Sequence, residues 1–532
     1  MAGNIIGIDL GTTNTCAAFV SNKIPRVIPT ESGFNTMPSV VTYLRDGSEF
    51  IGQSAKEHIV SNPEATVHEV KRLIGKQFSS PQIQELTRRF RYSILPDDNG
   101  EALVEVRGQK RSPIDVQSIL LRQIKRYAEI HLGDDIPEAV IAVPAYFTDH
   151  QRAQVKEAGT RAGFNVRRIV NEPTAAALAY GFNRGFDQRI LIYDFGGGTF
   201  DISILKLNGN VFEVIATGGD VFLGGADFDD RIVAWMVNEF QKANRIDLLE
   251  DSSAMAKVRN AAERAKIELS LLANTQIRIP EVINRKGKWL DLELVLGRDT
   301  LNAMTSDLVD RSFEVIDRLL QERGLRKDAI DEVILVGGQT RMPLVMDRIT
   351  EVFGKGPRKG VHPDECVAIG AALLGDSLSQ VDSVTLTDAL SIPIGIEGPR
   401  GALQVVLDKH NPLPQNGLCA VATSENDQAS LDIDIFQGQA GPVADAEYLG
   451  TVQYRDLPPG PAGSVKVSLR MAIDDEGMLE IRASHDSSDG RIVTLSTIER
   501  PVLEERVDTS YVKEPTPADS GSERTGIRGL MK

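Results

Sequence analysis

Residues 5–14 read IIGIDLGTTN, an apolar strand that runs directly into an aspartate, a glycine and two threonines. The order returns at residues 189–207, RILIYDFGGGTFDISILKL, where an apolar strand ends on Asp194 as the first one ends on Asp9. Small residues and a threonine follow each aspartate, and a second strand with apolar residues begins. Two such strand–turn–strand units about 185 residues apart predict an internally duplicated fold.

The glycines in these turns suit a phosphate ligand. Glycine lets the backbone approach a ligand closely and point several N–H groups toward one place. Because Asp9 and Asp194 would repel phosphate, a divalent cation is expected between them, and Mg²⁺ is usually held by one or two carboxylates, water and phosphate oxygens. A plain tight turn explains either copy alone, whereas the matched pair favours a polyphosphate site.

Further glycine turns and one polar helix face accompany the two hairpins. Residues 218–232, GGDVFLGGADFDDRI, lead into a predicted helix, and 331–343, DEVILVGGQTRMP, form a strand that ends in two glycines. The small residues of 362–375, HPDECVAIGAALLG, predict a helix that packs closely on a sheet. In the predicted helix 256–270, three polar residues fall within an arc of about 60°: Glu263, Lys266 and Ser270. This stripe is either a solvated face or a binding surface for a nucleoside.

Composition limits the class of protein. The chain has 532 residues, 41% of them hydrophobic and 25% charged, with a net charge of −16. That size predicts roughly three or four globular domains, and the acidic balance argues against nucleic-acid or anionic membrane partners. Three cysteines without disulfide or zinc spacing, no signal peptide and no long apolar run predict a soluble, cytoplasmic protein. Nothing in the sequence indicates a stable oligomer.

Six motifs in order resemble those of the Hsp70 chaperone family: IGIDLGTTNT, VPAYFTDHQR, NEPTAAALAYG, IYDFGGGTFDIS, LGGADFD and VILVGGQTRMP. Any one of them could mark the wider actin-like ATPase superfamily, but the set, with KRLIG at 71–75, is specific to Hsp70 proteins. The resemblance is continuous over residues 1 to about 380. It continues more weakly to about residue 500.

The resemblance implies an α/β actin-like ATPase fold, with two duplicated lobes of mixed sheets and flanking helices, followed by an antiparallel β-sandwich. The predicted domains are a nucleotide-binding domain at 1–378, a linker at 379–388, a substrate-binding sandwich at 389–500 and a disordered tail at 501–532. The strand alternation of SLDIDIFQG and SVKVSLRMAI independently predicts the sandwich. The tail is rich in proline, serine and mixed charge, without apolar periodicity. No helical lid is therefore expected over the sandwich, and peptide release should be fast with ATP and with ADP.

The resemblance also implies roles for residues at matching positions. Expected cofactors are ATP or ADP and Mg²⁺, with K⁺ as a further candidate ion. The catalytic set is Lys71 for charge on the γ-phosphate, and Glu172, Asp194 and Thr199 for the attacking water. Asp9, Asp194 and Asp201 are expected near the metal, largely through waters. The expected nucleotide contacts are Gly11, Thr12, Thr13, Gly196, Gly197, Gly198, Gly224, Gly225, Glu263, Lys266, Ser270, Gly337, Gly338, Arg341 and Asp364.

The second half departs from the family pattern in two places. The linker reads Val384-Thr385-Leu386-Thr387-Asp388, with threonines where the family mostly has leucine, so weaker docking is expected. Pro144, Arg152 and Asp388 match the family's relay between nucleotide and linker, and Arg168, Asn171 and Asp388 match positions that meet J-domain cochaperones. The peptide groove keeps apolar character at two positions and loses it at the arch over the peptide; the matching residues are Ile396, Leu431, Pro399 and Ser424.

Three functions remain open at this point. The leading one is a monomeric chaperone of protein folding and the stress response. It would be a slow ATPase of the conformational-switch type that controls the binding of unfolded or specialised client polypeptides. A J-domain protein and a nucleotide exchange factor would be its partners. The second is a nucleotide-sensing scaffold or assembly factor for one folded partner, with little role for hydrolysis. The third is a small-molecule kinase of the same superfamily, which would not need residues 389–500.

Overall fold

The computed structural model describes residues 5–358, 360, 362–378, 384–485 and 491–493. The predicted tail and residues 379–383 of the predicted linker therefore lie outside the described residues.

The first lobe is built on a central sheet that contains the first predicted hairpin. The sheet order is β12-β11-β1-β2-β3, with β4 paired to β2; β1 is antiparallel to β2 and parallel to β11. The strands are β1 (Ile5–Leu10), β2 (Asn14–Ser21), β3 (Ile24–Val27), β4 (Met37–Pro38), β11 (Glu138–Val143) and β12 (Asn165–Asn171).

Two small sheets and short helices extend this lobe. β6-β5-β7 and β10-β9-β8 are both antiparallel. Their elements are β5 (Val40–Tyr43), β6 (Glu49–Ile51), α1 (Gln53–Lys56), α2 (His58–Ser61), β7 (Thr66–His68), the 3-10 turn η2 (Val70–Arg72), α3 (Pro81–Arg89), β8 (Ser93–Pro96), β9 (Ala102–Val106) and β10 (Gln109–Arg111).

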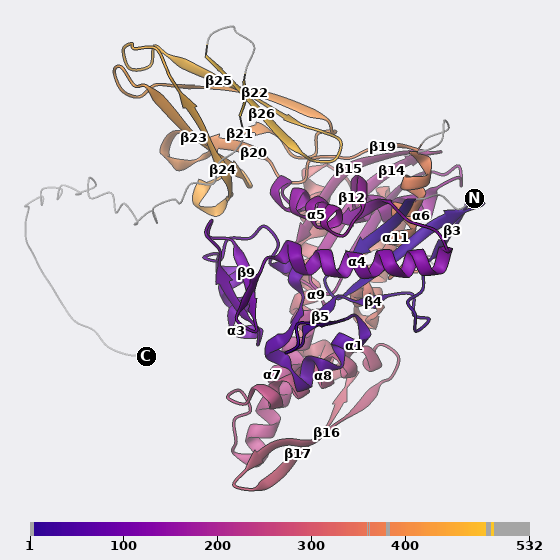
Figure 1. The fold of residues 1–532 in the computed structure, drawn as a ribbon. Coiled ribbons are helices and arrows are strands. Elements are labelled where there is room, and N and C mark those ends of the chain that lie inside the picture. The colour runs from indigo at the N-terminus through magenta and orange to yellow at the C-terminus, as the bar shows by residue number, and fades with distance from the viewer. Residues whose placement is uncertain (1–4, 359, 361, 379–383, 486–490, 494–532) are drawn as a thin grey trace, which may run out of the picture. The chain divides into compact units, whose positions relative to one another are not determined.

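The second lobe repeats the arrangement of the first. Its sheet has the order β18-β13-β14-β15-β19, with β13 antiparallel to β14 and parallel to β18, as β1 relates to β2 and β11. The predicted duplication is confirmed. The hairpin β16–β17 projects beyond α7 and α8 (Figure 1). The elements are β13 (Asp187–Phe195), β14 (Phe200–Asn208), β15 (Val211–Asp220), α7 (Gly225–Asn244), α8 (Ser252–Leu269), β16 (Asn274–Arg285), β17 (Lys288–Gly297), α9 (Arg298–Glu322), β18 (Glu332–Val336), η4 (Gly338–Arg341) and α10 (Pro343–Phe353).

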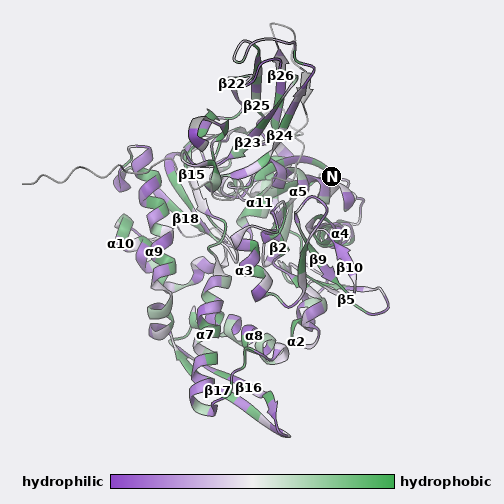
Figure 2. Cartoon of the chain, turned by 90° about the vertical axis from the view of Figure 1, so that its left-hand side faces the viewer, coloured by the Kyte–Doolittle hydropathy of each residue, from purple (hydrophilic) through white to green (hydrophobic). Residues whose placement is uncertain are grey.

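Two helices form a layer shared by both sheets, α6 (Glu172–Gly181) and α11 (Cys366–Ser377). Ile5 of β1 and Ile190 of β13 belong to one buried cluster with Ala175 of α6 and Ala371 of α11. The opposite faces of the two sheets are covered separately: by α4 (Pro113–Leu132) and α5 (Asp149–Arg161) in the first lobe and by α7 to α10 in the second. Helices such as α9 carry hydrophobic and hydrophilic residues intermixed along their length (Figure 2), as amphipathic helices with one buried face do.

The remaining described strands form the predicted antiparallel sandwich. Its two sheets have the orders β21-β20-β23-β24 and β22-β25-β26-β27, and one buried cluster, which includes Ile433 and Leu469, fills the space between them. The alternating residues of β23 and β25 supply that cluster, as their period of two requires. The strands are β20 (Ile394–Glu397), β21 (Leu403–Leu407), β22 (Gln415–Ala422), β23 (Ser430–Gln437), β24 (Glu447–Arg455), β25 (Lys466–Ile473), β26 (Leu479–His485) and β27 (Arg491–Val493).

The described part of the linker forms a strand of the second lobe, β19 (Thr385–Thr387), parallel to β15. Leu386 pairs with Phe212 and packs on the buried cluster shared by the two sheets, whereas Thr385 is exposed. Main-chain pairing does not depend on leucine, and β-branched threonine suits an extended strand. How strongly this strand docks stays a prediction.

The shared helical layer yields a test of the fold. A Cβ built on Gly370 of α11 would lie 1.7 Å from the carbonyl oxygen of Ala175 in α6. Gly370→Ala should therefore lower the free energy of unfolding by about 1–3 kcal/mol, because the two helices must separate. Gly356→Ala is the control, since the nearest atom there is 3.8 Å away. Urea unfolding that shows the same midpoint for both variants would contradict this packing.

Candidate functional site

The site lies where the turns of the two hairpins meet. A Cβ built on Gly197 would lie 1.9 Å from Thr13 Oγ1, and one on Gly198 would lie 2.6 Å from Thr12 Cγ2. A Cβ on Gly224, at the start of α7, would lie 2.5 Å from the backbone nitrogen of Gly198. Three predicted phosphate-binding turns thus converge from both lobes, and side chains at the glycines would fill the space between them.

Buried charged groups surround this convergence. Lys71, in η2, donates from Nζ to Glu172 Oε1 at 2.5 Å, and both side chains are less than a tenth exposed. Asp9 ends β1, while Asp194 and Asp201 lie opposite each other on β13 and β14. Four carboxylates therefore share one described lysine. The Oδ1 atom of Asp201 is buried without a hydrogen-bond partner.

Burial and mutual repulsion govern the protonation of this cluster. Desolvation, and then the charge of Glu172, raise the pKa of Asp9 and of Asp201 to about 7 and that of Asp194 well above its usual range. Desolvation alone would lower the pKa of Lys71, but the charges of Glu172 and Asp9 outweigh it and raise that pKa. Four carboxylates outnumber the one lysine, so a bound divalent cation would stabilise the ionised form of the cluster.

The residues present fit Mg²⁺ held through water. Among the described residues, no group of three His, Cys, Asp or Glu side chains is placed to ligate a metal directly. The unpartnered oxygen of Asp201 and the excess of carboxylates over cations nevertheless suit a hydrated ion. The metal roles of Asp9, Asp194 and Asp201 stay predictions, and K⁺ stays a candidate.

The predicted nucleoside contacts approach one another from three elements. On α8, Glu263 accepts from Lys56 Nζ at 2.8 Å, and Lys266 Nζ donates to the carbonyl of Gly225 at 2.7 Å. A Cβ on Gly225 would lie 2.9 Å from Lys266 Nζ and 3.0 Å from Gln339 Oε1, which brings η4 beside α8. The polar stripe on α8 therefore faces protein groups as well as solvent.

Three further predicted contacts, Gly337, Arg341 and Asp364, lie at or beside η4 at the end of β18. Gly337 has φ +80°, and its Cβ would lie 2.4 Å from the carbonyl oxygen of Phe195. Arg341 donates to Asp364 at 2.5 Å. Ser270 directly follows α8, and its hydroxyl lies 3.4 Å from the Lys266 carbonyl. In the turn between β13 and β14, the carbonyl of Thr199 accepts from the backbone N–H of Gly196 at 3.0 Å.

The structure adds cross-lobe ion pairs that the sequence did not reveal. Lys56 of α1 pairs with Glu263 of α8, and Arg72 pairs with Asp227 of α7 at 3.2 Å. Arg89 reaches Asp230 at 3.2 Å. The only sequence signal was the position of Arg72 beside Lys71, because charges that pair over more than a hundred residues leave no local pattern.

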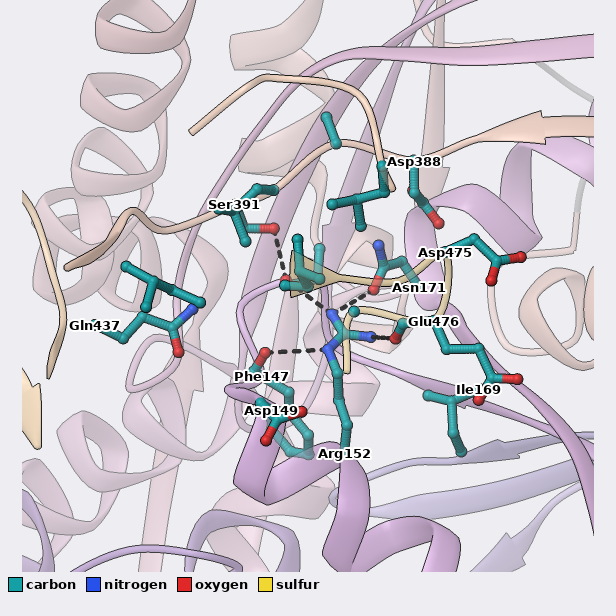
Figure 3. Close-up of a pocket in the computed structure, with 17 residues that line it drawn as sticks. Phe147, Asp149, Arg152, Ile169, Asn171, Asp388, Ser391, Gln437, Asp475 and Glu476 are labelled. Carbon is teal, nitrogen blue, oxygen red and sulfur yellow. Dashed lines mark hydrogen bonds between the residues drawn. The ribbon is translucent and has the colours of Figure 1, made fainter. Parts of the chain in front are cut away.

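Two of the predicted coupling residues, Arg152 and Asp388, line a small cavity (Figure 3). Arg152 is buried and donates to Asn171 Oδ1 at 2.6 Å and to the carbonyls of Ala145 and Phe147 at 3.2 Å. Asp388, at the end of the linker, accepts from Thr174 Oγ1 at 2.8 Å. The cavity encloses about 20 Å³, room for one water molecule.

The charges at this cavity are buried without a direct ion pair between them. Desolvation lowers the pKa of Arg152 and raises that of Asp388. Arg168 pairs with Asp475 of the sandwich at 2.7 Å, and the buried Pro144 carbonyl accepts from Phe147 N–H at 3.1 Å. Linker, sandwich and first lobe therefore meet at Arg152.

The four predicted groove residues lie in strands and loops of the sandwich. Ile396 and Leu431 belong to its buried cluster, with 3% and 6% exposure. Ser424 lies in the β22–β23 loop, where its backbone N–H donates to Gln428 Oε1 at 2.8 Å. Pro399 begins a 3-10 turn between β20 and β21. Their role in peptide binding stays a prediction.

Fold and site together define an actin-like nucleotide-binding protein with an attached β-sandwich, and two comparisons give the family. The family model described as "Hsp70 protein" matches residues 5–509. The curated "Chaperone protein DnaK" of Buchnera aphidicola subsp. Schizaphis graminum (strain Sg) is 42% identical over 487 residues, which cover 90% of this chain and 76% of that protein. The chain belongs to the Hsp70 family, a family of ATP-binding chaperones, and the predicted resemblance is confirmed. None of the described helices is both long and apolar enough to cross a bilayer.

The raised carboxylate pKa values predict how pH affects nucleotide binding. Asp9 and Asp201, with pKa values of about 7, are largely protonated at pH 6, whereas Mg²⁺ binding requires their ionised forms. Binding of Mg·ADP should release protons and weaken about tenfold per group between pH 8 and pH 6. Calorimetry in two buffers of different ionisation enthalpy measures the proton count.

Asp201→Asn is the matched control for this pH dependence, because it removes one titrating group and keeps its size. The phosphates of ADP titrate in the same way with either protein. The difference in pH dependence between the wild type and Asp201→Asn therefore comes from Asp201. An unchanged pH dependence in this variant would refute the assignment.

Proposed function

We propose that this protein is an ATP-driven chaperone that hydrolyses ATP slowly and uses the nucleotide state to control binding of client polypeptides by its sandwich. One observation supports the proposal most: Glu172 of the buried lysine–carboxylate cluster directly follows Asn171, which accepts from Arg152 at the cavity lined by linker and sandwich residues. A scaffold without hydrolysis would have no need of Lys71 and Glu172 at the centre of such a cluster.

The turns would bind the phosphates through backbone N–H groups, and Mg²⁺, when bound, would neutralise phosphate charge. Lys71 would stabilise charge on the γ-phosphate, since phosphoryl transfer depends on positioning and electrostatics more than on covalent help. Glu172, which begins α6, would orient the attacking water together with Asp194 and Thr199. The burial of the Glu172 carboxylate beside Lys71 supports this proposal.

The nucleoside would lie between α8 and η4. Glu263, Lys266 and Ser270 would offer hydrogen-bonding groups to it from one side, and Gly338, Arg341 and Asp364 would do so from the other. Release of nucleotide then requires the lobes to separate, which breaks the Lys56–Glu263 pair. A nucleotide exchange factor that separates the lobes is the expected partner for this step.

The sandwich would receive an extended client segment, with Ile396 and Leu431 beneath it. Extended segments bind such domains by main-chain hydrogen bonds and one apolar pocket. Arg168, Asn171 and Asp388 are the proposed contact for a J-domain protein, which would then act at the place where linker and first lobe meet. The protein is proposed to act as a monomer.

Measurement of ATP turnover separates the candidate functions. Purified protein is assayed alone, with unfolded peptides, and with a J-domain protein added. Stimulation by peptide and J-domain together supports the chaperone. Tight ATP binding with neither response favours the scaffold for one folded partner, and turnover driven only by a small metabolite would favour a kinase.

Substitution of Lys71 tests the catalytic assignment. Lys71→Ala should lower kcat by about a hundredfold or more, the usual cost of losing one charge-stabilising donor, while ADP binding persists. Lys110→Ala removes an exposed lysine of β10 and should leave kcat unchanged. If Lys71→Ala keeps wild-type kcat, Lys71 has no role in the chemistry.

A further inference from the structure

Arg72 of η2, in the first lobe, reaches the turn between β13 and β14 of the second lobe. Its side chain is 2% exposed, and Nη2 donates to the carbonyl of Gly198 at 2.9 Å. The same nitrogen donates at 3.2 Å to Oδ2 of Asp227, in the first turn of α7. Arg72 therefore contacts the main chain of a predicted phosphate-binding turn and lies beside the start of α7.

The carbonyls of the β13–β14 turn are held one after another. Two backbone N–H groups at the start of α7 donate to the carbonyls of Gly196 and Gly197, both at 2.9 Å. The next carbonyl along the chain, that of Gly198, accepts from the Arg72 side chain. Main-chain groups of the second lobe thus hold the first two peptide groups of the turn, and one side chain of the first lobe holds the third.

Each of these hydrogen bonds also fixes the direction of an N–H group. A trans peptide is planar, and its N–H points opposite to its C=O. The bond from Arg72 to the Gly198 carbonyl therefore turns the N–H of Thr199 away from Arg72. Among the described groups, the N–H groups of Gly197, Gly198 and Thr199 have no protein acceptor. All three are therefore available to a ligand.

Glycine at position 198 makes the third peptide group depend on Arg72. Gly198 has no side chain to restrict rotation of its main chain. A Cβ at this position would lie 2.9 Å from Arg72 Nε, so the absence of a side chain also lets the guanidinium come this close. The residue that permits the contact would therefore permit the peptide to rotate if the contact were lost.

The charges around Arg72 hold its guanidinium in this place. Glu69 Oε2 lies 3.5 Å from Arg72 Nε, and Asp227 lies beside Nη2. Arg89 belongs to the same group of charges, since it pairs with Glu69 and with Asp230, each at 3.2 Å. Among the described hydrogen bonds of Arg89, none reaches the turn. The two arginines therefore share a carboxylate partner and differ in the bond to the turn.

We propose that Arg72 is a positioning residue for ATP hydrolysis, which orients the peptide group between Gly198 and Thr199 so that the Thr199 N–H faces the γ-phosphate. This role rests on the proposed function, in which Thr199 helps to orient the attacking water. A rotated peptide would present a carbonyl oxygen to the phosphate in place of an N–H. Repulsion between the two oxygens would then slow hydrolysis, whereas ADP, which has no γ-phosphate, would still bind.

Single-turnover hydrolysis of ATP by the full-length chain tests this role, because product release does not enter the measured rate constant. Arg72→Gln should lower that rate constant about tenfold or more, part of the cost of losing one preorganised donor. The Kd for ADP should stay within about twofold of the wild-type value. Arg72→Lys keeps a cationic donor near the Gly198 carbonyl and should lose less of the rate than Arg72→Gln.

Arg89→Gln is the matched control, because it removes the same charge from the same group of ion pairs and leaves the Gly198 carbonyl bonded. Its rate constant should stay within about twofold of the wild-type value. An equal fall in both variants would assign the effect to the ion pairs and overturn the inference, as would a loss of ADP affinity as large as the loss of rate, or equal losses in Arg72→Lys and Arg72→Gln. A wild-type chain without hydrolysis would reject the proposed function and the inference together, whereas wild-type hydrolysis with an unchanged rate in Arg72→Gln would reject the inference alone.

Discussion

The arrangement of this protein depends on the burial of several carboxylates around one lysine. Asp9, Asp194, Asp201 and Glu172 come from three strands and a helix start, and Lys71 lies among them. Buried like charges are costly unless other groups compensate for them. The packing of the rest of the fold therefore holds these like charges together. A bound cation would offset their mutual repulsion.

The two lobes can converge on that cluster because their contacts are made by very small residues. α6 and α11 form the layer between the two sheets, and Gly7 and Gly370 bring main chain against main chain. A Cβ at Gly7 would lie 2.0 Å from Ala372 N and one at Gly370 would lie 1.7 Å from the Ala175 carbonyl oxygen, so larger residues would force these elements apart. Ion pairs such as Arg72–Asp227 then join the two lobes. Apolar packing of α6 and α11 sets the positions of the two sheets, and the charged pairs add contacts between the lobes that can break when the lobes separate.

Much of the architecture could be predicted because its signals are local. The order of apolar strand, aspartate and glycine gave both hairpins, and the period-two pattern of 430–437 and 466–473 gave the sandwich. Assignments of role, such as that of Lys71, needed the family resemblance, since a single lysine has no local signature. What could not be predicted is contact between distant charges, including Lys56–Glu263 and Lys76–Glu447. Such pairs depend on the final placement of whole domains, which no window of sequence encodes.

The linker strand β19 lies at the edge of the second-lobe sheet, beside β15. As long as it is there, the outer hydrogen-bonding groups of β15 are satisfied over residues 211–213. Departure of the linker would leave those groups facing water and leave Val211, already 43% exposed, beside an open edge. Undocking of this strand would therefore exchange main-chain hydrogen bonds to β15 for hydrogen bonds to water. Any extended segment able to occupy the vacated edge would compete directly with re-docking of the linker.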